Sequence, residues 1–384
     1  MTTDVLGPAA TPGSAIRTPE RLAGLDVLRA LAVVLVLYLS LASWLRRHGE
    51  KNQLTELIDA WIIGPAHFNQ DFGFFGFALF LLLSGFLAAR SGTERGAAEL
   101  LIRQFARVAP GFAVVLLVTG AAVTLGFFRL PDSTASPDST ASPDSTASVG
   151  AALVDMVVVS YFREPFVPLI GLAWTIISIL VGYLLLAAVL PVLRREPWLA
   201  IGLQVTVYVV LVALARQDDG ALAAVLGTVG GFGPVVVLGQ LGWLVHARRL
   251  PLAAGCALGA GCWGVFLWAE DPGYGRHADS YPLTLAVATL LLIVAVLASR
   301  SVPRTAAVDY LARRSYPIFL VHQPVGYPVL AAGTGALGGG PAAVLALVLT
   351  ALVAELVYRG VERPCAPPRQ SRRGGLHRVG GWRG

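Results

Sequence analysis

The chain has 384 residues, of which 55% are hydrophobic and only 14% are charged. Soluble domains carry about a quarter charged residues, so this composition excludes an ordinary water-soluble fold. The net charge of +6 rests on arginine, since Lys51 is the only lysine, and the sequence has no contiguous soluble basic patch of the kind that binds nucleic acid. We therefore expect an all-α integral membrane protein with no nucleic-acid partner.

Ten stretches are long and apolar enough to cross a hydrocarbon core of about 30 Å as helices. In chain order they comprise residues 26–45, 72–90, 110–128, 169–193, 199–215, 221–246, 250–269, 282–299, 315–334 and 341–358. Residues 150–162 are apolar but short, and Asp155 within them is typical of an interfacial segment. With a cytoplasmic N-terminus, only seven of the 29 basic residues fall in outer loops. The positive-inside rule therefore predicts that both termini are cytoplasmic.

The remaining segments differ in composition from the helices. Residues 1–20 contain no apolar run, so we expect a cytoplasmic tail, no cleavable signal peptide and an uncleaved first helix. Residues 131–148 repeat PDSTAS three times, which predicts an exposed, disordered extracytoplasmic loop. Residues 365–384 are basic and glycine-rich, as in a disordered cytoplasmic arm on anionic lipid headgroups. The transmembrane domain is thus expected at residues 21–364. The spacing of Cys256, Cys262 and Cys365 fits no metal site.

Ionisable residues inside a bilayer are costly and are functional candidates by default. Asp26 and Arg29 lie three residues apart near the cytoplasmic end of the first predicted helix. One interpretation is an interfacial salt bridge. The other is an anion site in which Arg29, Arg103 and Arg107 hold phosphates, since Arg103 and Arg107 share a helix face at i,i+4.

Two further helices carry small or aromatic residues of interest. Ser84 and Gly85 interrupt a very apolar helix, which usually indicates close helix packing. Trp174 and Tyr183 lie in the fourth apolar stretch, where interfacial aromatic residues are common.

His322 is the most distinctive polar residue in the chain. It lies between apolar residues in SYPIFLVHQPV, directly before Gln323 and Pro324. A histidine on an apolar face is either a structural hydrogen-bonding residue or a catalytic one, and the sequence leaves both open. Near the end of the last helix, Glu355 is placed to pair with Arg359 at i,i+4.

Six fragments in order carry a family resemblance. They read RLAGLDVLRALAVVLVLY, GFALFLLLSGFLAAR, IRQFARVAPGF, LAWTIISILVGYLLL, SYPIFLVHQPV and VERP. Together they resemble acyltransferase family 3, over about residues 20–364. The resemblance implies ten core helices and the transfer of acyl groups, commonly acetyl from cytoplasmic acyl-CoA, to hydroxyls of exported glycans, antibiotics or envelope components. The positions that match the family pattern include Arg29, Ser84, Gly85, Phe86, Arg107, Pro110, Trp174, Thr175, Tyr183, Ser315, Tyr316, His322, Glu362 and Pro364.

The chain departs from the family pattern at three ionisable positions. Ser40 stands where the family has a histidine in the first helix, the general base in the family's mechanism. Ala78 and Ile179 stand where an acidic residue and a glutamate are usual. The base could then be His322 or His67, and Ser40 could form a covalent intermediate if a base lay near it.

For an active enzyme of this family we expect His322 as the catalytic residue, with Arg29, Arg103 and Arg107 binding the donor. Ser40, Ser84, Trp174 and Tyr316 are expected in the cavity. We expect no bound cofactor or metal, with acyl-CoA as co-substrate, a glycan or lipid-linked acceptor, and membrane lipids as the other partners. The expected location is the plasma membrane of a bacterium, as a multi-pass protein.

Two alternatives to an enzyme remain open at this point. The first is an inactive family member that binds a glycan, a lipid or acyl-CoA, or scaffolds envelope assembly, because the family's base is replaced. The second is a transporter, for which Glu355 is the main candidate on an ion path.

Overall fold

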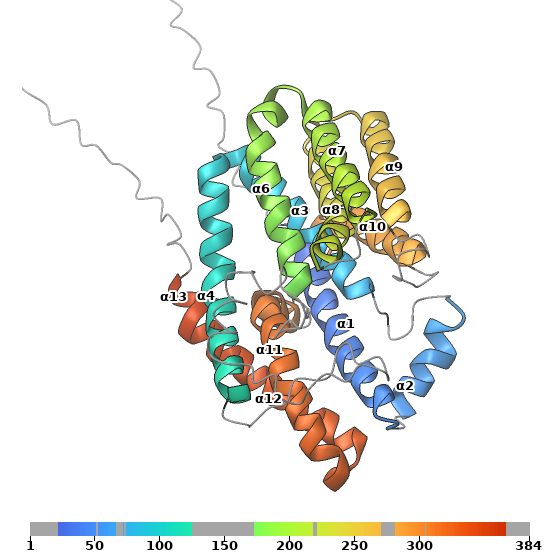
Figure 1. The fold of residues 1–384 in the computed structure, drawn as a ribbon, viewed down its shortest axis with the longest axis vertical. Coiled ribbons are helices and arrows are strands. Elements are labelled where there is room, and N and C mark those ends of the chain that lie inside the picture. The colour runs from blue at the N-terminus through green and yellow to red at the C-terminus, as the bar shows by residue number, and fades with distance from the viewer. Residues whose placement is uncertain are drawn as a thin grey trace, which may run out of the picture.

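The computed structural model describes residues 22–50, 53–66, 72, 74–124, 173–217, 221–269, 281–303 and 305–365. Nearly all of these residues lie in helices, and none lies in a strand (Figure 1). The long helices are α1 (Ala23–Arg47), α3 (Phe75–Arg95), α4 (Ala97–Thr124), α6 (Ala173–Arg195), α7 (Pro197–Ala215), α8 (Ala221–His246), α9 (Leu252–Ala269), α10 (Tyr281–Leu297), α11 (Ala306–Leu337) and α12 (Gly339–Val357). Short helical segments comprise α2 (Gln53–Ile58), Asp59–Ile63, Ala298–Arg300, Tyr358–Glu362 and α13 (Arg363–Cys365).

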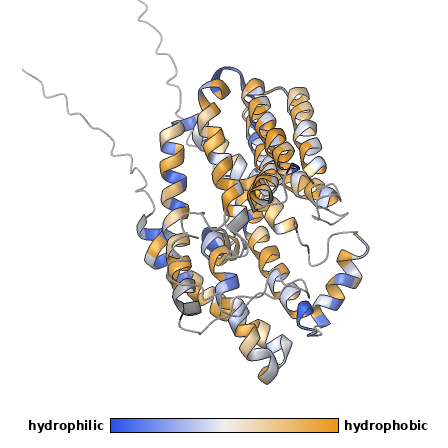
Figure 2. Ribbon diagram, viewed as in Figure 1, coloured by the Kyte–Doolittle hydropathy of each residue, from blue (hydrophilic) through white to orange (hydrophobic). Residues whose placement is uncertain are grey.

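Nine of the described helices are long and apolar enough to cross a membrane. Apolar residues predominate along these helices (Figure 2). The tenth predicted span, 315–334, lies within α11, which has 32 residues but begins with the polar segment AAVDYLARR. The fold is therefore the predicted all-α integral membrane protein.

Helices α4 and α11 begin before their predicted spans, and several predicted segments cannot be compared. The third apolar stretch was expected to begin at residue 110, but α4 begins at Ala97, because Glu99 and the arginines after it lower the hydropathy without breaking the helix. The two terminal segments, the repeat at 131–148 and the segment 150–162 lie outside the described residues.

Helices α3 and α8 cross at the centre of the bundle, where they are the most buried of the candidate spans. Glycine makes this crossing close. A Cβ atom on Gly85 would lie 1.8 Å from the carbonyl oxygen of Val236, and one on Gly239 would lie 2.0 Å from that of Leu82. The prediction of tight helix packing at Gly85 is confirmed, since only glycine allows two backbones to approach this closely.

Helix α11 packs along α1 and is covered on another side by α12. Helices α1 and α11 run parallel, because residues further along α1 contact residues further along α11. Ser40 meets His322, Leu41 lies near Gly326, and Leu45 belongs to the same apolar cluster as Leu330. The parallel pairing of α1 and α11 therefore places particular residues from the first and last parts of the chain at the same depth in the bundle.

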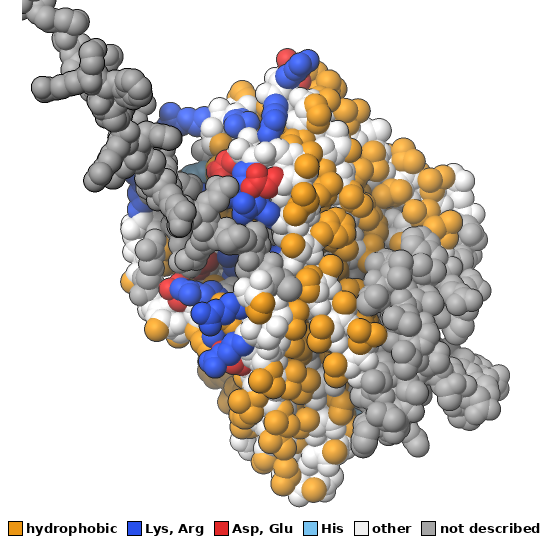
Figure 3. Space-filling model, turned by 90° about the vertical axis from the view of Figure 1, so that its left-hand side faces the viewer, with side chains coloured by type: hydrophobic (Ala, Val, Ile, Leu, Met, Phe, Trp, Pro, Cys, Tyr) orange, Lys and Arg blue, Asp and Glu red, His pale blue; other side chains and the backbone are white. Residues whose placement is uncertain are grey.

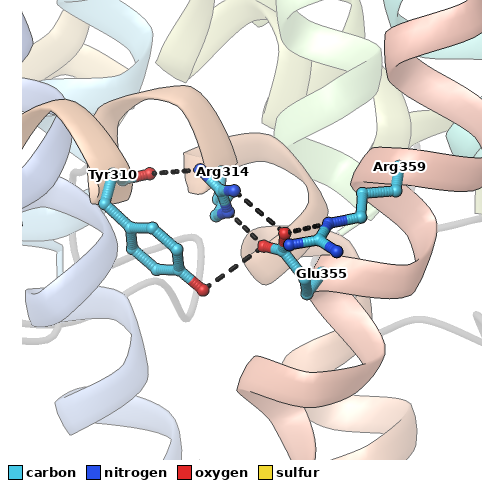
Figure 4. Close-up of polar contacts among 4 residues, drawn as sticks. All are labelled: Tyr310, Arg314, Glu355 and Arg359. Atoms are coloured by element: carbon cyan, nitrogen blue, oxygen red, sulfur yellow. Dashed lines mark hydrogen bonds and ion pairs between the residues drawn. The ribbon is translucent and has the colours of Figure 1, made fainter.

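A network of charges ties the start of α11 to the end of α12 (Figure 4). The guanidinium of Arg314 donates to both oxygens of Glu355 and lies 3.9 Å and 4.5 Å from the ring centroids of Tyr310 and Tyr358. Arg359 Nε donates to Glu355 Oε1 at 2.6 Å, as the i,i+4 spacing predicts. Glu355 is thus held by two cations as a structural group, which argues against its use on an ion path.

Candidate active site

A serine–histidine pair lies between α1 and α11. His322 Nε2 and Ser40 Oγ are 3.0 Å apart, and the two residues are only 3% and 4% exposed. The other ring nitrogen, Nδ1, lies 2.7 Å from the carbonyl oxygen of Phe319. A carbonyl only accepts hydrogen bonds, so we assign the ring proton of the neutral imidazole to Nδ1. Nε2 is then the acceptor, and the Ser40 hydroxyl donates to it.

Helix geometry places the pair well inside the bundle. Ser40 is 17 residues beyond Ala23, and His322 is 16 residues beyond Ala306. At 1.5 Å per residue, both lie about 24–26 Å from the start of their helices. The equal depth follows from the parallel course of α1 and α11. Pro324, two residues beyond His322, removes one backbone donor from α11 and favours a bend at this level.

A second group of polar side chains continues from Ser40 toward the C-terminal end of α1. The hydroxyl of Tyr327 lies close to the side chains of Ser40 and of Arg47, the last residue of α1. Gln323 Nε2 also donates to this hydroxyl, at 3.2 Å. The sequence analysis missed Tyr327, although its i,i+4 spacing from Gln323 puts both on one face of α11.

A third group lies on the opposite side of the pair, toward the start of α1. Ser84 on α3 lies close to the side chain of Tyr183 on α6. Arg29 on α1 and Arg107 on α4 lie close enough to Tyr183 to interact with it electrostatically. Four helices thus bring a serine, a tyrosine and two cations to one place.

Tyr316 and Glu362 extend this third group toward α11 and the end of the chain. The Tyr316 hydroxyl donates to the carbonyl oxygen of Val108 at 2.7 Å, which joins α11 to α4. Glu362 interacts electrostatically with Tyr316 and Arg107. Its Oε1 atom is buried without a hydrogen-bond partner among the described residues.

The three arginines expected to bind the donor have different surroundings. Arg29 forms the i,i+3 ion pair with Asp26, at 3.3 Å, yet also acts on Tyr183. Arg103 is turned along its own helix and binds Glu99 at 2.6 Å through Nη2. Arg107 has an exposed side chain on α4. Basic and acidic side chains interrupt the apolar surface on the face that carries α4 and α13 (Figure 3).

The other positions named from the sequence either are apolar or lie outside the described residues. Ala78 is fully buried and Ile179 packs against the apolar core, so neither position supplies a charge. The side chain of Trp174 and the whole of His67 lie outside the described residues. Of the two histidines considered as a base, the structure describes His322.

The chain matches the family model of the acyltransferase domain over residues 22–359. Searches of curated proteins and of solved structures gave no match. The family match covers nearly the whole chain and every helix from α1 to α12, in agreement with the resemblance in the sequence. The protein is therefore a multi-pass membrane member of acyltransferase family 3.

Proposed function

We propose that the protein is an O-acyltransferase. It moves an acyl group, acetyl in the simplest case, from acyl-CoA on the cytoplasmic side to a hydroxyl of an exported glycan or another envelope or secondary-metabolite acceptor. It does so in the plasma membrane of a bacterium. The observation that carries this proposal is His322, whose Nε2 lone pair meets a hydroxyl group in the buried interior.

Acyl transfer from a thioester to a hydroxyl requires a base that takes the hydroxyl proton. A positioned general base contributes about 10²–10⁴-fold to the rate. His322 suits this role because its Nδ1–H is held by the Phe319 carbonyl, which leaves Nε2 to accept a proton. The family's base in the first helix is thus replaced by a base on α11 that reaches the same place.

The donor's phosphates are bound by Arg29 and Arg107; Arg103, which is paired with Glu99, lies one turn away from Arg107 on α4 and contributes less. Arg29 is eleven residues before Ser40 on α1, or about 16 Å along the helix. A pantetheine arm is long enough to span this depth. The phosphates then remain at the cytoplasmic arginines while the thioester reaches His322.

Mass spectrometry of surface and secreted glycans from a deletion strain tests the proposal. Deletion should remove one acyl substituent, and the native gene should restore it, whereas His322→Ala should not. His48→Ala is the matched control, because His48 is an exposed histidine at the end of α1. Membrane levels of each variant separate lost chemistry from lost protein.

In the purified protein, Arg29→Ala and Arg107→Ala should raise the KM for acyl-CoA. Arg103→Ala should have a smaller effect, because Arg103 is already neutralised by Glu99.

The replacement of three ionisable family positions by Ser40, Ala78 and Ile179 favours a second candidate function. In this alternative the fold binds a glycan, a lipid or acyl-CoA, or scaffolds envelope assembly, without catalysis. Unchanged acylation in the deletion strain would support it and contradict the enzyme. Acyl-CoA binding by the purified protein, with no release of free thiol, would support the binding form of this alternative.

A further inference from the structure

We propose that Ser40 is a covalent acyl carrier: the donor acylates its hydroxyl, and the acceptor then takes the acyl group from it. This proposal rests on the function proposed above and defines its reaction path. It changes the order of events from a single transfer between two bound substrates to two transfers through the protein.

The first support is the arrangement of an activated nucleophile. Such sites bring together a hydroxyl, a base within hydrogen-bonding distance of it, and a third group that orients the base. Here these are the Ser40 hydroxyl, His322 Nε2 at 3.0 Å, and the Phe319 carbonyl at 2.7 Å from Nδ1. The side chain of Tyr327 also lies close to Ser40.

The two steps balance in atoms and charge. In the first, the Ser40 hydroxyl proton moves to His322 Nε2 while Oγ attacks the thioester carbonyl carbon. The carbon–sulfur bond breaks, and the thiolate leaves with the proton from His322, so that Ser40 becomes an ester. In the second, the acceptor hydroxyl gives its proton to His322 and attacks the ester carbonyl. The Ser40 oxygen then leaves and recovers its proton.

The second support is the position of the pair between two polar groups. Arg29, with Arg107 and Tyr183, lies toward the start of α1, about 16 Å along the helix from Ser40. Arg47, with Tyr327, lies about 10 Å beyond Ser40 at the other end. A carrier between them lets a donor from one side and an acceptor from the other react in turn, without meeting each other.

The protein in lipid nanodiscs tests this with radiolabelled acetyl-CoA and no acceptor. The wild type should release one equivalent of thiol in a burst and carry one acetyl group, which peptide mapping places at residue 40. Ser40→Ala should lose both signals, and His322→Ala should slow the burst by about 100-fold or more. Ser43→Ala is the matched control on the same helix and should retain both.

Ser40→Cys separates a carrier from a structural serine. It should retain an acyl-enzyme, now as a thioester that neutral hydroxylamine cleaves, whereas loss of a merely structural hydroxyl would leave no such product. Thermal stability of each variant shows whether a lost signal reflects a lost fold.

The deletion strain distinguishes failure of this proposal from failure of the function. If deletion removes an acyl group from cells but Ser40→Ala restores it fully, and no acylated residue 40 is trapped, the carrier is refuted while the function stands. If deletion removes nothing, the function fails and the carrier fails with it.

Discussion

Replacing Gly85 by alanine should strongly destabilise the helix bundle. The added Cβ would lie 1.8 Å from the carbonyl oxygen of Val236, whereas Cβ contacts under 3.0 Å are essentially never seen. The difference is 1.2 Å, so α3 and α8 must move apart by at least this much at their crossing. Neither side of the contact can rotate away, because the obstacle is backbone. Overpacking of this kind lowers the free energy of unfolding by about 1–3 kcal/mol, and for Gly85→Ala we expect a value at the upper end of this range.

The assay is unfolding in mixed detergent micelles, followed by the fluorescence of the eight tryptophans. Gly202→Ala is the matched control, because a Cβ on Gly202 meets no heavy atom within 4 Å, and alanine is the better helix former by about 1 kcal/mol. Adding Gly239→Ala to Gly85→Ala should cost less than Gly239→Ala alone, since the helices have already parted. An unfolding midpoint of Gly85→Ala equal to that of the wild type would refute the close crossing.

Three further predictions use the same unfolding assay. Gln204→Leu should lower the free energy of unfolding by about 1–3 kcal/mol, because it leaves the buried amide of Gln240 without its reciprocal partner. Replacing both glutamines by leucine should lower it by less than the single replacement does. Arg314→Ala should lower the unfolding midpoint more than Arg359→Ala. Both arginines bind the Glu355 carboxylate, but the Arg314 side chain is 13% exposed and that of Arg359 is 69% exposed. Equal effects of the two replacements would contradict the prediction. Tyr316→Phe should cost about 0.5–1.5 kcal/mol through the lost hydrogen bond between α11 and α4, and no measurable change would count against that bond.

The order of the long helices in the described part of the chain was predictable because hydropathy responds directly to the bilayer. The boundaries were less so. Helix α4 begins thirteen residues before the predicted span, and α11 begins nine residues before its own, at 306 rather than 315. Both extensions carry charged residues, which hydropathy excludes but which form helix readily in the interfacial region.

The candidate site was predictable in its members but not in its contacts. His322 and Ser40 were both of interest, yet 282 positions separate them in the chain. Their contact depends on α1 and α11 lying side by side and parallel, which no local pattern encodes. Tyr327 was missed for the same reason, since its spacing from Gln323 gains meaning only when Ser40 is known to face it.

The replacement of the family's helix-one histidine by Ser40 need not mean loss of activity. A histidine at that place would take a proton from the acceptor directly, whereas a serine there needs a base beside it. In the reaction path proposed above His322 is that base, with its proton held on Nδ1 and Nε2 directed at the hydroxyl. A serine that had merely replaced a lost catalyst would need no such partner, and burying a histidine is costly unless both ring nitrogens are satisfied. His322 has a partner at both ring nitrogens, and the Ser40–His322 pair lies between two polar groups from opposite ends of α1, which is the position that a relay between donor and acceptor requires.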